Sequence, residues 1–132
     1  MGASPIQRIN VEGVARLPSF SHATVADGFV HVSGVLGTQE GTLNLVSGIG
    51  DQTRRALGNL RAVLAAAGAT AADVVKVNVY LVDQADFPAM NAAYDEFFGA
   101  THVPARATVG VQWLAMGALV EIDCLARTDV TA

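Results

Sequence analysis

At 132 residues the chain has the length of one ordinary domain, residues 1–132, which can bury enough surface to fold without disulfides or a metal ion. It is 52% hydrophobic and only 15% charged, yet no window approaches the roughly 20 apolar residues of a membrane span, so we expect self-association to cover the excess apolar surface. The net charge of −4, with basic residues scattered along the sequence, argues against a nucleic-acid partner.

Strand patterns open the chain. Residues 5–11 and 22–35 are rich in β-branched and aromatic side chains, and part of the second stretch alternates apolar with polar residues. The Asp-Gly pair at 27–28 is a strong hairpin signal within it. Residues 34–50 are rich in Gly, Thr, Asn and Ser, which predicts a loop with at most one short strand near Leu43.

Helical spacing begins after residue 50. The apolar residues that share it are Leu57, Leu60, Val63, Leu64 and Ala67. Asp51 suits the positive end of the helix dipole, and Gly68 is a typical stop signal. In residues 74–81, valines alternate with polar residues, and this period of two predicts a strand with two chemically different faces.

A second helix is expected between Asp86, as its N-cap, and Gly99, with Pro88 tolerated in the first turn. Its apolar stripe, which we assign to the core, consists of Phe87, Met90, Tyr94 and either Phe97 or Phe98. Two strands, 106–112 and 119–126, close the chain. This order of elements predicts an α+β fold with one mixed sheet and both helices on one face. The other face, with many apolar groups, is expected to pack against copies of itself.

Familiar cofactor and metal signatures are missing from the sequence. It has no P-loop, no dinucleotide-binding glycine pattern and no HExxH, and its histidines, His22, His31 and His102, lie far apart. We therefore expect no cofactor and no metal. The single cysteine, Cys124, belongs to the apolar alternation of the last strand and is assigned to the core. No secretion signal is visible in residues 1–10, so we expect a cytoplasmic protein.

Charge inside apolar strands suggests a binding site. Arg106, Thr108 and Gly110 share one face of their strand, and Glu121 and Asp123 share one face of the next. If these two strands pair as a hairpin, an arginine and one or two carboxylates line one side of the sheet. Two interpretations stay open: a solvent-facing ion pair worth about 0–1 kcal/mol, or a guanidinium that awaits a ligand carboxylate, which it matches with two hydrogen bonds.

Motifs from about residue 18 to residue 126 occur together at spacings typical of one family. They are Ser33-Gly34, Gln52-Thr53, Asn59-Leu60, Ala67-Gly68-Ala69, Asp73-Val74-Val75-Lys76, Asp86-Phe87, Met90-Asn91, Tyr94, Phe97-Phe98, Pro104-Ala105-Arg106 and Gly117-Ala118-Leu119-Val120-Glu121-Ile122. In these residues the chain resembles the RidA family, also called YjgF or L-PSP endoribonuclease-like.

The resemblance implies a chorismate-mutase-like fold and a homotrimer whose sheets face inward, with pockets between neighbouring subunits. It also implies that Arg106 holds the substrate carboxylate, that Glu121 orients a water, and that Ser33 and Asn91 line the pocket. The implied reaction is hydrolytic deamination of reactive 2-imino or enamine acids, such as 2-iminopropanoate and 2-iminobutanoate, to 2-keto acids and ammonia.

The chain departs from the best-known deaminases of that family at several positions, and the usual Leu-Pro is Leu114-Ala115 here. Phe20 stands where they have a tyrosine, His22 replaces a glutamine, and Thr108 stands where they often have a cysteine. We assign Phe20 and Thr108 to substrate binding. Two other functions remain as alternatives. One is a non-catalytic sensor or binding module for small carboxylates that uses Arg106, and the other is a ribonuclease, which the acidic net charge disfavours.

Overall fold

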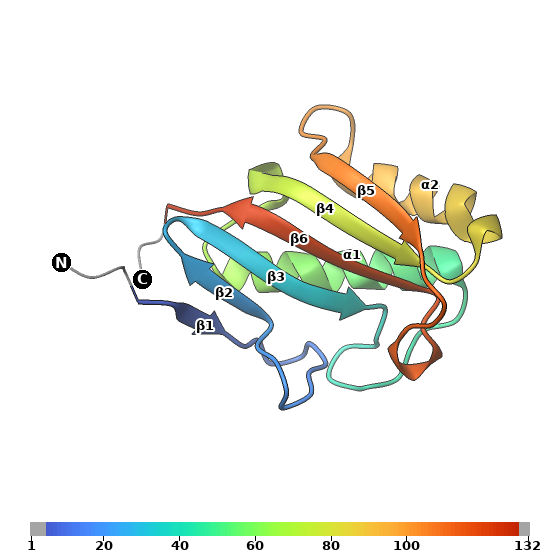
Figure 1. The fold of residues 1–132 in the computed structure, drawn as a ribbon, viewed down its shortest axis with the longest axis horizontal. Helices are drawn as coiled ribbons and strands as arrows, with labels where there is room; N and C mark the ends of the chain where they lie inside the picture. Colours follow the sequence, from blue (N-terminus) through green and yellow to red (C-terminus); the bar gives the residue numbers. More distant parts are fainter. Residues whose placement is uncertain (1–4, 130–132) are drawn as a thin grey trace.

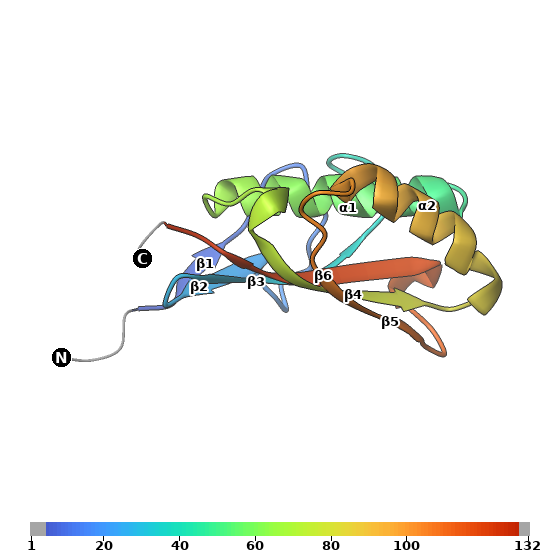
Figure 2. The same cartoon turned by 90° about the horizontal axis from the view of Figure 1, so that it is seen from above.

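Six strands form one mixed sheet in the computed structural model, which describes residues 5–129 (Figure 1). The strands are β1 (Gln7–Ile9), β2 (Ala23–Ala26), β3 (Phe29–Leu36), β4 (Val74–Leu81), β5 (Ala105–Gly110) and β6 (Val120–Arg127). Two helices, α1 (Ile49–Ala66) and α2 (Phe87–Phe98), lie on the same face of the sheet (Figure 2). The predicted α+β class and single helical layer are confirmed. No helix in the described part is long and apolar enough to cross a membrane.

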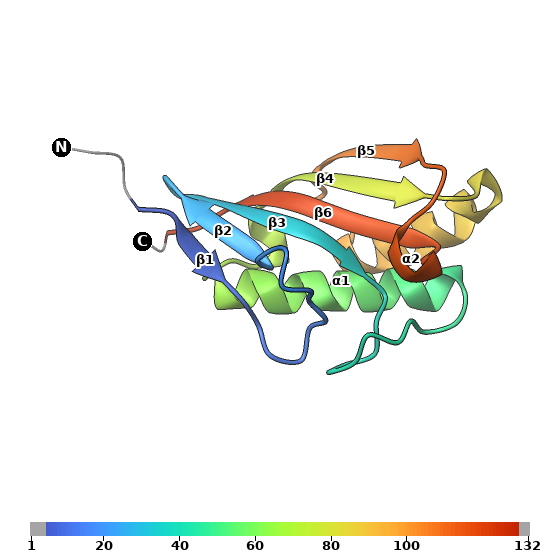
Figure 3. The ribbon, with the colours of Figure 1, turned by 60° about the horizontal axis from the view of Figure 1, so that its bottom comes forward.

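The strand order is β1-β2-β3-β6-β4-β5 (Figure 3). All neighbours are antiparallel except β4 and β5, which run parallel because α2 carries the chain back across the sheet between them. The last strand, β6, enters between β3 and β4. The expected hairpin of the last two strands is therefore wrong, since β4 separates β5 from β6.

Two predicted element boundaries coincide with residues of positive φ. Asp27 and Gly28 have φ angles of 52° and 83°, the pair of positive values that a tight hairpin between β2 and β3 requires, so that prediction is confirmed. Gly99, with a φ of 68°, ends α2 as expected. The short strand expected near Leu43 is wrong, because only an isolated bridge between Thr38 and Leu45 occurs in that loop.

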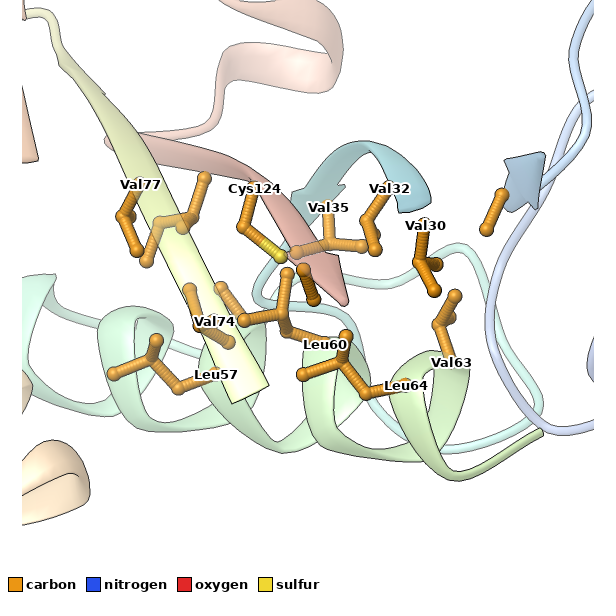
Figure 4. Packing of buried hydrophobic residues seen from close by; sticks show 14 of the residues in the cluster. Val30, Val32, Val35, Leu57, Leu60, Val63, Leu64, Val74, Val77 and Cys124 are labelled. Atoms are coloured by element: carbon orange, nitrogen blue, oxygen red, sulfur yellow. The ribbon is translucent and has the colours of Figure 1, made fainter. Parts of the chain in front are cut away.

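The hydrophobic core lies between the sheet and α1 (Figure 4). Leu57, Leu60 and Leu64 of α1 are fully buried against valines of β3 and β4. Cys124 is buried among them, which confirms its assignment to the core. Helix α2 adds Met90, Tyr94 and Phe98 to the buried set. Phe87, also assigned to the core, is exposed instead.

The other face of the sheet has no helix over it in residues 5–129 (Figure 2). It is more polar than the sequence analysis expected. Asn78 and Tyr80 of β4 both donate hydrogen bonds to the carboxylate of Asp123 on β6, at 2.8 and 2.7 Å. Phe29 and Val109 are the large apolar side chains exposed on this face. The uncovered face is thus present, but its apolar content is lower than expected.

Candidate functional site

Arg106 and Glu121 lie on opposite faces of the sheet. Arg106 is paired with Val77, whose side chain is buried under the helices, whereas Glu121 is paired with Tyr80 on the uncovered face. Paired positions on neighbouring strands share a face. The expectation that one side of the sheet carries both groups is therefore wrong, and its physical reason is the strand order, which replaces the expected hairpin by two strands separated by β4.

Three of the predicted site residues, Phe20, Ser33 and Glu121, line one cavity of about 350 Å³ beside the end of β3. The Ser33 hydroxyl donates a hydrogen bond to the Ser21 carbonyl at 2.7 Å, and its backbone N–H donates to the His22 carbonyl at 2.9 Å. Both bonds hold the loop that carries Phe20. Ser33 therefore shapes the cavity, and its hydroxyl proton is already used.

The side chain of His22 also holds the loop that carries Phe20. Its imidazole is buried, with Nδ1 accepting a hydrogen bond from the Val11 N–H at 2.9 Å. That bond requires the neutral tautomer with a proton on Nε2, which lies 3.0 Å from the Ala15 carbonyl and donates to it. The imidazole thus bonds the backbone at two points, and it bears on the site through the position of the loop rather than by contact with the cavity.

The position of the Glu121 carboxylate depends on Gly34 of β3. A bulge interrupts the pairing of β3 with β6 between Val32 and Val35, and Gly34 lies within it. A Cβ atom built on Gly34 would overlap the Glu121 carboxylate. The carboxylate therefore lies directly against the bare backbone of the bulge, and any side chain at position 34 would force the Glu121 carboxylate to move.

Glu121 is also the carboxylate left free at the cavity. Its neighbour Asp123 is engaged by Asn78 and Tyr80, and the hydrogen bond to Asp123 raises the pKa of Tyr80 to about 12. No hydrogen bond joins the side-chain carboxylate of Glu121 to another residue of the described chain. Partial burial, and then the charge of Asp123, raise the pKa of Glu121 above its usual value. A carboxyl group with a raised pKa is better suited to exchange a proton near neutral pH.

The other predicted residues, Arg106, Asn91 and Thr108, form a second group between β5 and α2. Nη1 of Arg106 donates a hydrogen bond to the Asn91 side-chain oxygen at 2.8 Å. The guanidinium carbon lies 4.5 Å from the centre of the Tyr94 ring and 5.7 Å from that of Phe87, within range of cation–π attraction. No carboxylate of residues 5–129 forms an ion pair with Arg106; the pairs present are those of Arg54. The interpretation of Arg106 as one half of a surface ion pair is therefore wrong.

Thr108 follows Arg106 on the same face of β5. Its hydroxyl is buried and makes no hydrogen bond within the described chain, and the same holds for the hydroxyl of Tyr94. Buried hydroxyls nearly always have a partner, so each retains the capacity to bond a water or a ligand. The helical period predicts only the face of α2 on which Tyr94 and Phe87 lie. Their contact with Arg106 depends on the register in which β5 pairs with β4, and the helical period does not predict that register.

Comparisons with known proteins show which proteins this chain resembles. The model of the family described as Endoribonuclease L-PSP matches residues 13–128. A RutC family protein of Pyrococcus horikoshii is 43% identical over 83% of this chain and 87% of its own. A protein of Dermatophagoides farinae named 2-iminobutanoate/2-iminopropanoate deaminase is 41% identical over 80% and 83%. Among solved structures, that of Escherichia coli TdcF with bound serine is 26% identical, with a TM-score of 0.86 over 93% of this chain and 99% of the other.

Proposed function

The chain belongs to the endoribonuclease L-PSP (RidA) family, and on that premise we propose that it hydrolyses reactive 2-imino or enamine acids, such as 2-iminopropanoate and 2-iminobutanoate, to 2-keto acids and ammonia. The observation that carries the proposal is the state of Arg106. Its guanidinium is held by Asn91 and by two aromatic rings, and it has no carboxylate partner in the described chain. It is thus pre-oriented for the carboxylate of a ligand.

The chemistry needs few groups, because a protonated imine is already electrophilic. Arg106 holds the substrate carboxylate, and Glu121 orients a water toward the imine carbon and accepts its proton. Addition of the water gives a tetrahedral carbinolamine. Return of the proton to nitrogen lets ammonia leave as the C–N bond breaks, and the C=O bond forms as the hydroxyl proton passes to the departing ammonia, which is released as ammonium. The raised pKa of Glu121 suits both proton transfers.

Self-association reconciles this mechanism with the separation of the two groups. In one chain Arg106 and Glu121 lie on opposite faces of the sheet, so a shared site needs Arg106 of one copy beside Glu121 of another. The chain offers two surfaces for such contact, the outer edge of β5 and the sheet face without a helix. A homotrimer with inward-facing sheets uses both and forms three equivalent sites.

We predict a trimer in solution. Sedimentation or light scattering at micromolar concentration is expected to give about three times the chain mass of 13.6 kDa. Dilution into the range where the assembly dissociates is expected to abolish activity, because each site then loses one of its two groups. A monomer that retains full activity would contradict the shared site.

We also predict that Gly34→Ala lowers kcat for imine hydrolysis by roughly 10- to 100-fold, because the new Cβ displaces the Glu121 carboxylate by an ångström or more. The matched control is Gly58→Ala in α1, where nothing lies within 4 Å of the added atom. This second substitution is expected to leave kcat unchanged and to stabilise the helix by about 0.5–1 kcal/mol. Equal activities of the two variants would show that the position of Glu121 is unimportant.

A non-catalytic binding module is the second candidate, and the absence of a hydroxyl on Phe20 favours it. The experiment that separates the two is release of ammonia or keto acid from freshly generated 2-iminopropanoate. Release faster than the spontaneous reaction supports hydrolysis. Binding of pyruvate without acceleration supports the binding module. A ribonuclease is disfavoured by the net charge of −4, since contacts to phosphate dominate the affinity for nucleic acids.

A further inference from the structure

Exposed apolar side chains gather around the cavity that holds Glu121. Leu17, Phe20, Leu43 and Met116 are 51%, 38%, 50% and 49% exposed, and all four line this cavity. They come from three separate segments: the loop before β2, the loop between β3 and α1, and the turn before β6. Large apolar groups left in water on converging loops are typical of a surface that binds an apolar ligand group.

The other polar side chains of the same cavity each form hydrogen bonds within the chain. Nη1 of Arg16 donates to the Leu17 and Phe20 carbonyls, and the Asn59 amide donates to the Leu36 carbonyl at 2.9 Å. The Ser33 hydroxyl is bonded to the backbone, as described above. Glu121 is therefore the one carboxylate that the cavity presents to a ligand. A molecule that fits has an apolar body with its reacting polar end at Glu121.

Met116 has an unusual backbone conformation. Its φ and ψ angles of 59° and 19° are left-handed, which is uncommon for a residue with a side chain. The next residue, Gly117, also has a positive φ, of 72°. Such strained positions concentrate where a side chain is held for a ligand. Here the turn brings the Met116 side chain to the rim of the cavity, although glycine would adopt the same conformation without strain.

We propose that this cavity holds the side chain of the substrate, and that the protein prefers 2-imino acids with a branched aliphatic, thioether or aromatic side chain over the imine of alanine. The proposal rests on the proposed function and adds the substrate class. A methyl group would leave most of the cavity of about 350 Å³ filled with water against Leu17, Leu43 and Met116. An isobutyl or thioether chain removes that apolar surface from water, and each buried carbon adds affinity.

The test compares imines generated in place by an amino-acid oxidase from leucine and from alanine. Release of keto acid above the spontaneous rate gives kcat/KM for each. We expect the leucine-derived imine to exceed the alanine-derived imine by about tenfold or more. Calorimetric titration with 4-methyl-2-oxopentanoate and with pyruvate is expected to show a preference of about the same size, independent of turnover.

Two substitutions locate the preference in the cavity. Leu43→Ser and Met116→Gly are each expected to lower the ratio of the two kcat/KM values by about threefold or more, because each removes apolar contact area. Met116→Gly also suits the backbone at that position, so its fold is secure. The controls are Leu43→Met, which keeps an apolar side chain of similar volume, and Val75→Ser, which removes an exposed apolar group outside the cavity. Both are expected to keep the ratio.

The outcomes separate this proposal from the function on which it rests. Equal kcat/KM values with equal affinities for the two keto acids would overturn the preference and leave the hydrolase intact. No turnover of either imine, with tighter binding of 4-methyl-2-oxopentanoate, would overturn the hydrolase and leave the preference. A preference that survives both Leu43→Ser and Met116→Gly would show that the side chain binds elsewhere, which also overturns the proposal.

Discussion

Arg106→Ala is expected to lower kcat/KM for imine hydrolysis by at least about 100-fold while the protein stays folded and assembled. The substitution removes a charge-assisted pair with the substrate carboxylate, worth about 1.5–3 kcal/mol. It also removes the orientation of the imine carbon toward the water at Glu121, which raises the loss further. Steady-state rates measure the loss of activity. Thermal unfolding and sedimentation of the same preparation test whether the variant stays folded and assembled. Arg106→Lys is expected to restore activity only in part, because an ammonium lacks the planar two-point contact.

The chain contains a matched control for that experiment. The guanidinium carbon of Arg61 lies 4.5 Å from the centre of the Phe97 ring, the same distance that separates Arg106 from Tyr94. Arg61→Ala therefore removes a comparable cation–π contact with α2 but no proposed ligand contact. Its kcat/KM is expected to match that of the unmodified protein. Undiminished keto-acid release by Arg106→Ala, or an equal loss in both variants, would place the carboxylate site elsewhere.

Mixed assemblies are expected to recover activity that neither parent has. Glu121→Gln alone should lower kcat by about 10²–10⁴-fold, because it removes the proton acceptor. Co-expression of Glu121→Gln chains with Arg106→Ala chains produces some interfaces that carry both native groups. With random assembly of a trimer from equal amounts, about a quarter of the sites are intact. The expected activity of the mixture is therefore about a quarter of that of the unmodified protein.

Two controls make the mixing experiment decisive. Each variant expressed alone and purified in the same way is expected to remain inactive. A mixture of Arg106→Ala chains with Gly34→Ala chains tests the same geometry through the bulge, since Gly34 acts on Glu121 in its own chain. If the mixtures are no more active than their parents, Arg106 and Glu121 act from a single chain and the shared site is wrong.

Local patterns in the sequence were sufficient for the elements but not for their arrangement. The alternation in residues 74–81 predicts β4 with its boundaries, and the Asp-Gly pair predicts the turn between β2 and β3. Alternation also shows that Arg106 and Thr108 share a face. The alternation does not predict which of the two faces contacts the helices, because that depends on how β5 pairs with β4, a segment about 30 residues earlier.

The candidate site shows the same difference: its residues could be predicted from the sequence, but their arrangement could not. Motifs pointed to Arg106, Glu121, Ser33 and Asn91, and the structure separates these residues into two groups. The contacts of Tyr94 with Arg106, and of Gly34 with Glu121, could not be predicted from spacing. Both depend on how separate elements pack against each other, and the helical period predicts only that Tyr94 is buried, which the structure confirms.

The burial of Cys124 has a practical consequence for following the unfolding of this protein. Burial, and then the charge of Asp123, raise the pKa of its thiol to about 12, so almost no thiolate exists at neutral pH. The thiol belongs to β6, which is paired on both sides, by β3 and by β4. It is also the one cysteine of the chain. A thiol-reactive dye therefore reacts with Cys124 only when the centre of the sheet opens. The rate of labelling then reports how often the protein unfolds far enough to expose this one thiol.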